Sequence, residues 1–174
     1  MSIKSMLKIA TLGAILLAAA NSYAQQANPL DVVPDKMPFE TPYGAPISLE
    51  RANSILNAAL AEAKKRDWKM NCAVVDSGAN LVAFQRMDQA QLASIDVSIH
   101  KARTSAKFRR ETKLFESVIQ GGLTASLTLD DVIASRGGIP LIENGKIIGA
   151  IGCSGGAGSQ DEVTAKAGIA SMTK

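Results

Sequence analysis

His100 is the only histidine in the sequence, so imidazole chemistry has one candidate per chain. Polar residues recur around it at spacings of three and four, which places them on one face of a helix; they are Asp96, Arg103, Thr104 and Lys107. Such a face can offer an imidazole as a metal ligand, beside cations that can pair with carboxylates. The alternative is a solvated polar face on which Asp96, one turn earlier, holds His100.

Other catalytic and metal sites lack residues that they need. One histidine and two separated cysteines cannot supply the four spaced ligands of an ordinary structural zinc site, and a catalytic zinc site is equally poor. A Ser-His-Asp triad would have to be built on His100. The glycine-rich stretch 152–158 resembles an anion-binding loop, yet it lacks the Lys-Ser/Thr of a P-loop. Glycines that permit a sharp strand-to-helix turn are the alternative there.

Apolar periodicity predicts the elements that must position these residues. We expect helices over 48–66, 95–106, 112–119 and 161–172, and β-hairpins over 72–84 and 139–151, the second around Asn144-Gly145. Ser48 and Thr112 are predicted to cap their helices. Helices and hairpins in this order indicate an antiparallel sheet covered by helices, rather than a βαβ alternation, so the predicted fold class is α+β.

The first residues have the composition of a targeting segment. Lys4 and Lys8 precede an apolar run too short to span a bilayer, and Ser22 and Ala24 stand at the −3 and −1 positions of a cleavage site. We therefore expect a signal peptide at 1–24, a Pro-rich arm at 25–47, a domain at 48–174, and a periplasmic or secreted protein without a stable membrane anchor.

Charge and aromatic content exclude a nucleic-acid partner. Without Lys4 and Lys8 the mature chain keeps 17 of the 19 Lys and Arg and all 16 Asp and Glu, a net charge of +1. A balance so close to neutral gives no basic footprint, and aromatics at 4% offer no stacking platform.

Cys72 and Cys153 each lie inside an apolar run that is typical of a strand. In an oxidising compartment they could form a disulfide. Two buried free thiols are the alternative, because free cysteine is among the most buried residue types.

Four short segments, in one order, resemble a known family. They are residues 73–78 with Leu81 and 86–88, residues 101–108, residues 137–140, and residues 149–156. Together they are similar to the GlcG/HbpS-like haem-binding (haem-degrading) domain, which is also related to the C-terminal domain of PduO-type proteins. The resemblance covers most of 48–172, with Cys153 standing where the family tends to have an aliphatic residue.

The resemblance implies a profilin-like fold of α/β/α layers with a five-stranded antiparallel sheet, and homo-oligomers from dimer to octamer. In that strand order the first strand lies beside the last, which favours pairing of Cys72 with Cys153. The resemblance also implies haem as the ligand. His100 or Thr104 would then face the iron, and the propionates would be held by Lys101, Arg103 and Lys107.

These observations lead to one functional hypothesis and one alternative. The hypothesis is an extracytoplasmic haem- or tetrapyrrole-binding protein that assists haem degradation or iron acquisition; whether it is an enzyme stays open. The alternative is a module without haem, tied to glycolate or diol metabolism, that binds a small metabolite or serves assembly through the glycine loop at 155–158.

Overall fold

The computed structural model describes residues 32–173. The chain divides into two units, Met1–Pro38 and Phe39–Lys174, and the described helices and strands all belong to the second. The second unit includes residues of the expected Pro-rich arm as well as the domain expected from Ser48 onward, and that boundary stays a prediction. The predicted signal peptide and the first part of the arm lie outside the described residues. Within 32–173 no helix has the length and apolarity that a membrane crossing requires.

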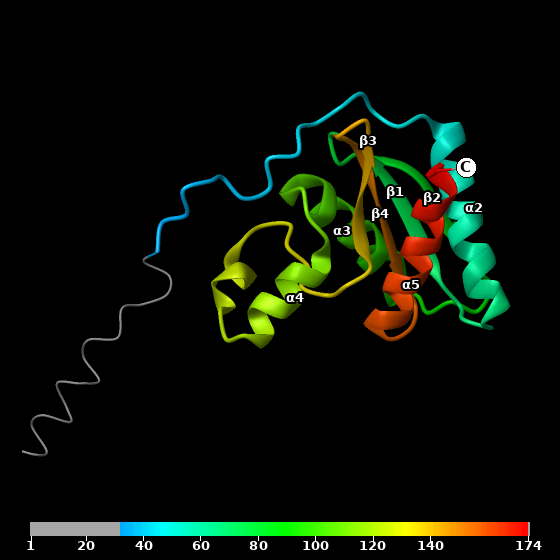
Figure 1. The fold of residues 1–174 in the computed structure, drawn as a ribbon. Helices are drawn as coiled ribbons and strands as arrows, with labels where there is room; N and C mark the ends of the chain where they lie inside the picture. Colours follow the sequence, from blue (N-terminus) through cyan, green and yellow to red (C-terminus); the bar gives the residue numbers. More distant parts are fainter. Residues whose placement is uncertain (1–31, 174) are drawn as a thin grey trace, which may run out of the picture. The chain divides into compact units, whose positions relative to one another are not determined.

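The domain alternates helices and hairpins in the predicted order (Figure 1). Its elements are α2 (Leu49–Lys65), β1 (Asn71–Asp76), β2 (Leu81–Arg86), α3 (Ala93–Phe108), α4 (Thr112–Gln120), the 3-10 helix η2 (Thr124–Thr128), β3 (Gly138–Glu143), β4 (Lys146–Ser154), α5 (Gly158–Ile169) and the 3-10 helix η3 (Ala170–Thr173). Ser48 caps α2 as predicted, because its hydroxyl accepts the Arg51 N–H at 3.3 Å. Thr112 does not cap α4: it is the first helical residue, and its Oγ1 accepts the Gly138 N–H at 3.0 Å.

The described strands form one antiparallel sheet of four, in the order β2-β1-β4-β3. The first strand lies beside the last, as the resemblance implied, but the expected fifth strand is wrong for the described residues. Residues 42–47 run along the start of β4, yet they make only an isolated bridge between Tyr43 and Ile147. Pro42 and Pro46 have no N–H to donate, so a continuous ladder cannot form.

This stretch of the arm nevertheless belongs to the folded domain. Ile47 is buried in the core and its N–H donates to the Ile148 carbonyl at 2.9 Å. The Tyr43 hydroxyl lies 3.0 Å from the carbonyl oxygens of Ala106 and Lys107, at the end of α3. The last residues of the predicted Pro-rich arm therefore pack against both the sheet and α3.

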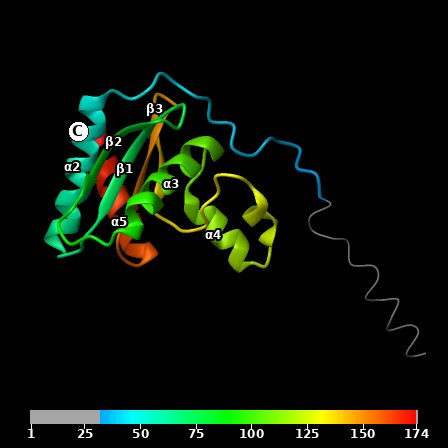
Figure 2. The same ribbon diagram turned by 180° about the vertical axis from the view of Figure 1, so that it is seen from behind.

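Two helical layers cover the sheet, one on each face (Figures 1 and 2). Alternate residues of β1 separate the layers: Cys72 and Val74 pack into the core under α2 and α5, whereas Ala73 and Val75 pack beneath α3. The α/β/α arrangement expected from the resemblance is therefore present, with α3 alone in its layer above the central strands.

Helix α3 approaches the sheet at two glycines that are partners in the ladder between β3 and β4, Gly138 and Gly152. A Cβ on Gly152 would lie 2.1 Å from the Ser98 carbonyl oxygen, and one on Gly138 would lie 2.3 Å from the Lys101 carbonyl oxygen. Only bare backbone fits beneath α3 here. Small buried residues of α3, among them Ala102, complete the contact.

Cys72 and Cys153 lie opposite each other on β1 and β4, with their Cα atoms 4.2 Å apart, and form a disulfide. Both are fully buried. The bond joins the two central strands across 81 residues of sequence.

Replacing both cysteines by alanine is expected to lower the free energy of unfolding by about 2–5 kcal/mol, because the bridge restricts the unfolded chain. Urea unfolding of the mature protein measures this change. Reductant should lower the urea midpoint of the wild type and leave that of the double variant where it is. Two free thiols at full occupancy in the non-reduced protein, seen by mass spectrometry, would contradict the bond.

Candidate functional site

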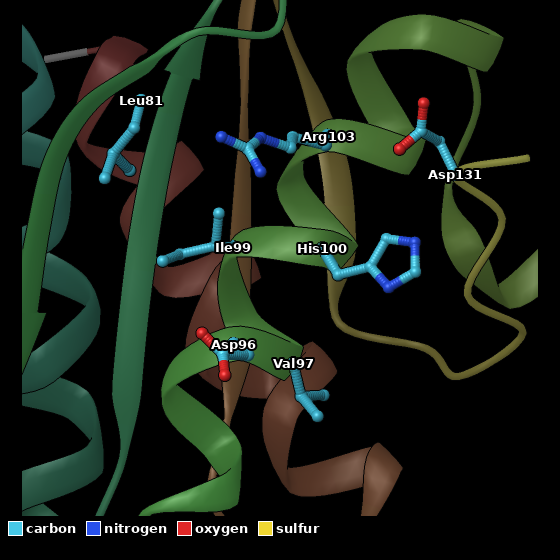
Figure 3. A pocket seen from close by; sticks show the side chains of 7 residues that line it. All are labelled: Leu81, Asp96, Val97, Ile99, His100, Arg103 and Asp131. Carbon is cyan, nitrogen blue, oxygen red and sulfur yellow. The ribbon is translucent and has the colours of Figure 1, made fainter.

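A cleft of about 460 Å³ opens beside α3, within the size range of small-molecule sites. Figure 3 shows the side chains that line it, most of them from α3: Asp96, Val97, Ile99, His100 and Arg103, with Leu81 from β2 and Asp131 from the loop before β3. The predicted helical face thus forms one wall of a cleft, and the loop supplies another.

His100 has an unusual polar environment. Its Nε2 is buried and has no hydrogen-bond partner among the described residues. The imidazole points to the side of α3 that faces the loop carrying Asp131 (Figure 3). A buried polar atom without a partner costs about 1–3 kcal/mol, so it marks a place where a ligand or water would be favoured. The structure shows no hydrogen bond between His100 and Asp96, the pair that the alternative of a solvated polar face had proposed.

Arg103 lies on the opposite flank of the helix and extends toward Leu81 (Figure 3). It forms no ion pair or hydrogen bond with another described side chain, so its guanidinium is available to an anionic ligand. Val97, Ile99 and Leu81 provide apolar surface along the same cleft. This combination of an apolar wall, an imidazole and a cation suits a partly apolar ligand that carries acidic groups.

Thr104 does not face the cleft as the helical spacing suggested. It is fully buried, and its Oγ1 donates to the Asp131 carbonyl at 2.5 Å and accepts the Ile133 N–H at 3.1 Å. Both bonds pin the loop onto α3 one turn beyond His100. The hydroxyl is therefore occupied, and the structure does not place it as an iron ligand.

Lys107 stays at the surface but is already paired. Its ammonium forms an ion pair with the Asp131 carboxylate, and both side chains are nearly half exposed. The Lys107 hydrogen bond holds the pKa of Asp131 below its ordinary value, and the charge of Arg103 contributes in the same direction. Asp131 therefore neutralises Lys107, one of the cations predicted to bind the carboxylates of a ligand.

Lys101 lies in the interior, with 1% of its side chain exposed, and cannot hold a ligand at the cleft. Its Nζ donates to the Asp161 carboxylate at 2.7 Å. Burial raises the pKa of Asp161 above its ordinary value, while Lys101 and the amides of Gly155 and Gly156 oppose that rise. Asp161, near the start of α5, is thus a buried partner of Lys101.

The glycine loop before α5 is closed to an anion by its own side chains. The Gly156 N–H donates to Asp161 at 3.1 Å and the Ala157 N–H to Gln160 at 2.8 Å. The glycine-x-serine-x-glycine spacing at 152–156 does not mark a nucleophile, since Ser154 is buried and its hydroxyl bonds that of Ser94 at 3.1 Å. This loop serves the packing of β4 against α5.

Comparisons with known proteins decide the family. The family described as "Haem degrading protein HbpS-like" matches residues 47–170. The chain belongs to this HbpS-like family. It is 41% identical over 108 residues to protein GlcG of Escherichia coli strain K12, which covers 62% of this chain and 81% of GlcG.

Two solved structures extend the comparison of this HbpS-like chain. A PduOC:haem complex superposes with a TM-score of 0.67 and 28% identity, over 72% of this chain and 94% of PduOC. A double mutant of HbpS from Streptomyces reticuli superposes with a TM-score of 0.69 and 26% identity, over 84% of this chain and 98% of that protein. The family expected from the four sequence segments and the predicted α+β fold class are confirmed.

Sequence spacing identifies three of the cleft residues and misses others. Asp96, His100 and Arg103 are on the predicted face, whereas Leu81 was predicted only as part of a hairpin and Asp131 lies outside the predicted helices and hairpins. No local pattern joins Asp131 to His100. Among the described residues, no group of three or more His, Cys, Asp or Glu could hold a metal ion.

Lys101→Met tests the buried ion pair. The substitution leaves the Asp161 carboxylate buried without its cation, so the free energy of unfolding should fall by about 3–5 kcal/mol at neutral pH. Losing the cation also raises the folded-state pKa of Asp161 further. A raised folded pKa lowers stability as pH rises through it, so the deficit should shrink as the pH falls toward the ordinary carboxyl range.

Urea unfolding of wild type and variant across this pH range measures the effect. In the matched double variant Lys101→Met/Asp161→Asn, the amide oxygen can still accept the Gly156 N–H and carries no charge. The loss of unfolding free energy in this double variant should be smaller than in Lys101→Met and independent of pH. A deficit in Lys101→Met that stays constant with pH would show that Asp161 is not charged in the folded protein.

Proposed function

We propose that this protein is an extracytoplasmic haem-binding protein whose ligand enters the cleft beside α3. The observation that carries the proposal is the buried, unpartnered Nε2 of the only histidine, on the wall of a partly apolar cleft. Membership of the HbpS-like family and the likeness to a PduOC:haem complex support haem as the ligand.

The residues of the cleft fit the group. His100 supplies an orphaned imidazole nitrogen of the kind that ligates haem iron. Arg103 is a guanidinium without a partner side chain among the described residues, suited to a propionate, and Ile99 and Leu81 offer apolar surface to the ring. Bound haem would supply redox-active iron. Thr104 and Lys101 are not part of this proposal, since both are already bonded inside the protein.

Export is proposed from the signal-peptide pattern at 1–24. The disulfide between Cys72 and Cys153 supports it, because such bonds persist in oxidising compartments. Fractionation of producing cells, with N-terminal sequencing of the mature protein, tests this part, and cleavage is expected after Ala24.

Self-assembly, from dimer to octamer, is also proposed. Apolar side chains stay exposed on α4 and the segment after it: Leu114, Val118, Leu123, Leu127 and Leu129. Exposed apolar side chains gathered in one segment are typical of a surface that another subunit covers. Light scattering of the mature protein measures its mass in solution and so the number of subunits.

A haem titration of the mature protein tests the binding site. Wild type should develop a Soret band that saturates at a fixed stoichiometry, and His100→Ala should change its position and weaken binding. Arg103→Gln should raise the Kd about fivefold, since an exposed ion pair contributes up to about 1 kcal/mol. Lys64→Gln, an exposed lysine outside the cleft, is the matched control and should leave both properties unchanged. Identical titrations for wild type and His100→Ala would reject the site.

Haem degradation is proposed only as a further activity of the same site. Because haem exposed to a reductant can decompose without an enzyme, the measurement is turnover. Product in excess of one equivalent per subunit, lost in His100→Ala, would establish an enzyme. Product that stops at one equivalent would leave a binding protein.

A further inference from the structure

The loop that carries Asp131 is fastened to α3 at three points, all on the side that His100 faces. Two are the bonds of Thr104 Oγ1 to the Asp131 carbonyl and the Ile133 N–H. The third is the ion pair between Lys107 and the Asp131 carboxylate. His100, Thr104 and Lys107 follow one another along this side of the helix.

The side of α3 to which this segment is bonded is also the side toward which the buried His100 Nε2 points. The imidazole points toward the loop that carries Asp131 (Figure 3), and Nε2 is out of contact with solvent although other parts of the residue are partly exposed. Solvent that cannot reach this nitrogen implies that a larger ligand cannot reach it either while the segment stays in place. At the same time the nitrogen has no partner among the described residues, so the closed arrangement leaves a polar atom unsatisfied.

We propose that residues 131–133 form a latched cover over His100, which must lift from Thr104 and Lys107 before a ligand atom can reach Nε2. This inference rests on the proposed function for the identity of the ligand, but not for the existence of the cover. The two hydrogen bonds and the ion pair make the closed conformation the major one. A ligand binds the open conformation, which is the minor one. Apparent affinity is then reduced by the fraction of molecules that are open.

Asp131 is suited to such a segment. Its backbone is in the left-handed region, with φ of 63°, and its side chain is exposed. The residue therefore contributes to closure through its carbonyl and carboxylate, and not through burial of apolar surface. A segment held by a few polar contacts can open without unfolding the domain.

The experiment measures access to the sole histidine directly, without haem. Diethylpyrocarbonate acylates accessible imidazole nitrogens, and because His100 is the only histidine, the rate at which its Nε2-carbethoxy product forms reports access to one atom. Wild type should react slowly relative to free N-acetylhistidine. Asp131→Asn removes the ion pair and keeps the backbone latch, so it should react about threefold faster. Thr104→Val removes both hydrogen bonds and should react about tenfold faster.

Asp67→Asn is the matched control. Asp67 also has a positive φ, of 55°, and an exposed ion pair, with Lys69 at 2.5 Å, but it lies in the turn after α2. Its substitution should leave the modification rate at the wild-type value. Circular dichroism checks the fold of Thr104→Val, and Asp131→Asn, an exposed change, keeps the test decisive if the valine variant misfolds.

The outcomes separate the cover from the proposed function. Wild type that reacts as fast as N-acetylhistidine, or Asp131→Asn at the wild-type rate, would overturn the cover whether or not haem binds. Faster modification in both Asp131→Asn and Thr104→Val, the two latch variants, with no haem binding in any protein, would support the cover and reject the proposed ligand. If both ideas hold, the latch variants should also bind haem with a Kd lowered by the same factors.

Discussion

The close approach of α3 to the sheet is the constraint on which the site depends. Gly138 and Gly152, paired across β3 and β4, leave no side chain between the strands and the helix, so the backbone of α3 lies directly on them. Contact at this distance fixes the rotation of the helix about its axis as well as its height. Ala102 must face inward, and the side of α3 that carries His100 and Arg103 must face the cleft.

Much of the fold could be predicted because its signals are local. The turn at Asn144-Gly145 has positive φ at both residues, as a two-residue hairpin turn requires. The apolar stripe of α2 is equally local. The pairing of β1 with β4 has no such signal, since its partners lie far apart in sequence; only the family resemblance indicated it. The fifth strand was implied by the resemblance alone, and the missing N–H groups of Pro42 and Pro46 interrupt the ladder that it would need.

The site was predicted less well than the fold, and the reason is geometric. Spacings of three and four define a helical face only broadly, so they could not separate His100, at the cleft, from Thr104, beneath the loop. Lys101 shows the same limit more sharply. Its position is decided by Asp161, 60 residues later, and a carboxylate at a helix start gives no sign in the sequence that it will be buried. A charged residue is predicted to be exposed unless a partner is known. Whether one is buried depends on a partner from another helix or strand, which its own local sequence does not reveal.

The ion pairs around the cleft link ligand binding to the loop that carries Asp131. Lys101 is neutralised inside the protein and Lys107 is engaged by Asp131, which leaves Arg103 as the cation without a partner side chain in the described cleft. A ligand carboxylate that draws Lys107 away from Asp131 removes one of the fastenings of residues 131–133. The same ligand would gain access to His100 through that movement. Because binding and opening each favour the other, and such coupling is reciprocal, an acidic ligand would open the cover more effectively than a neutral one of the same shape.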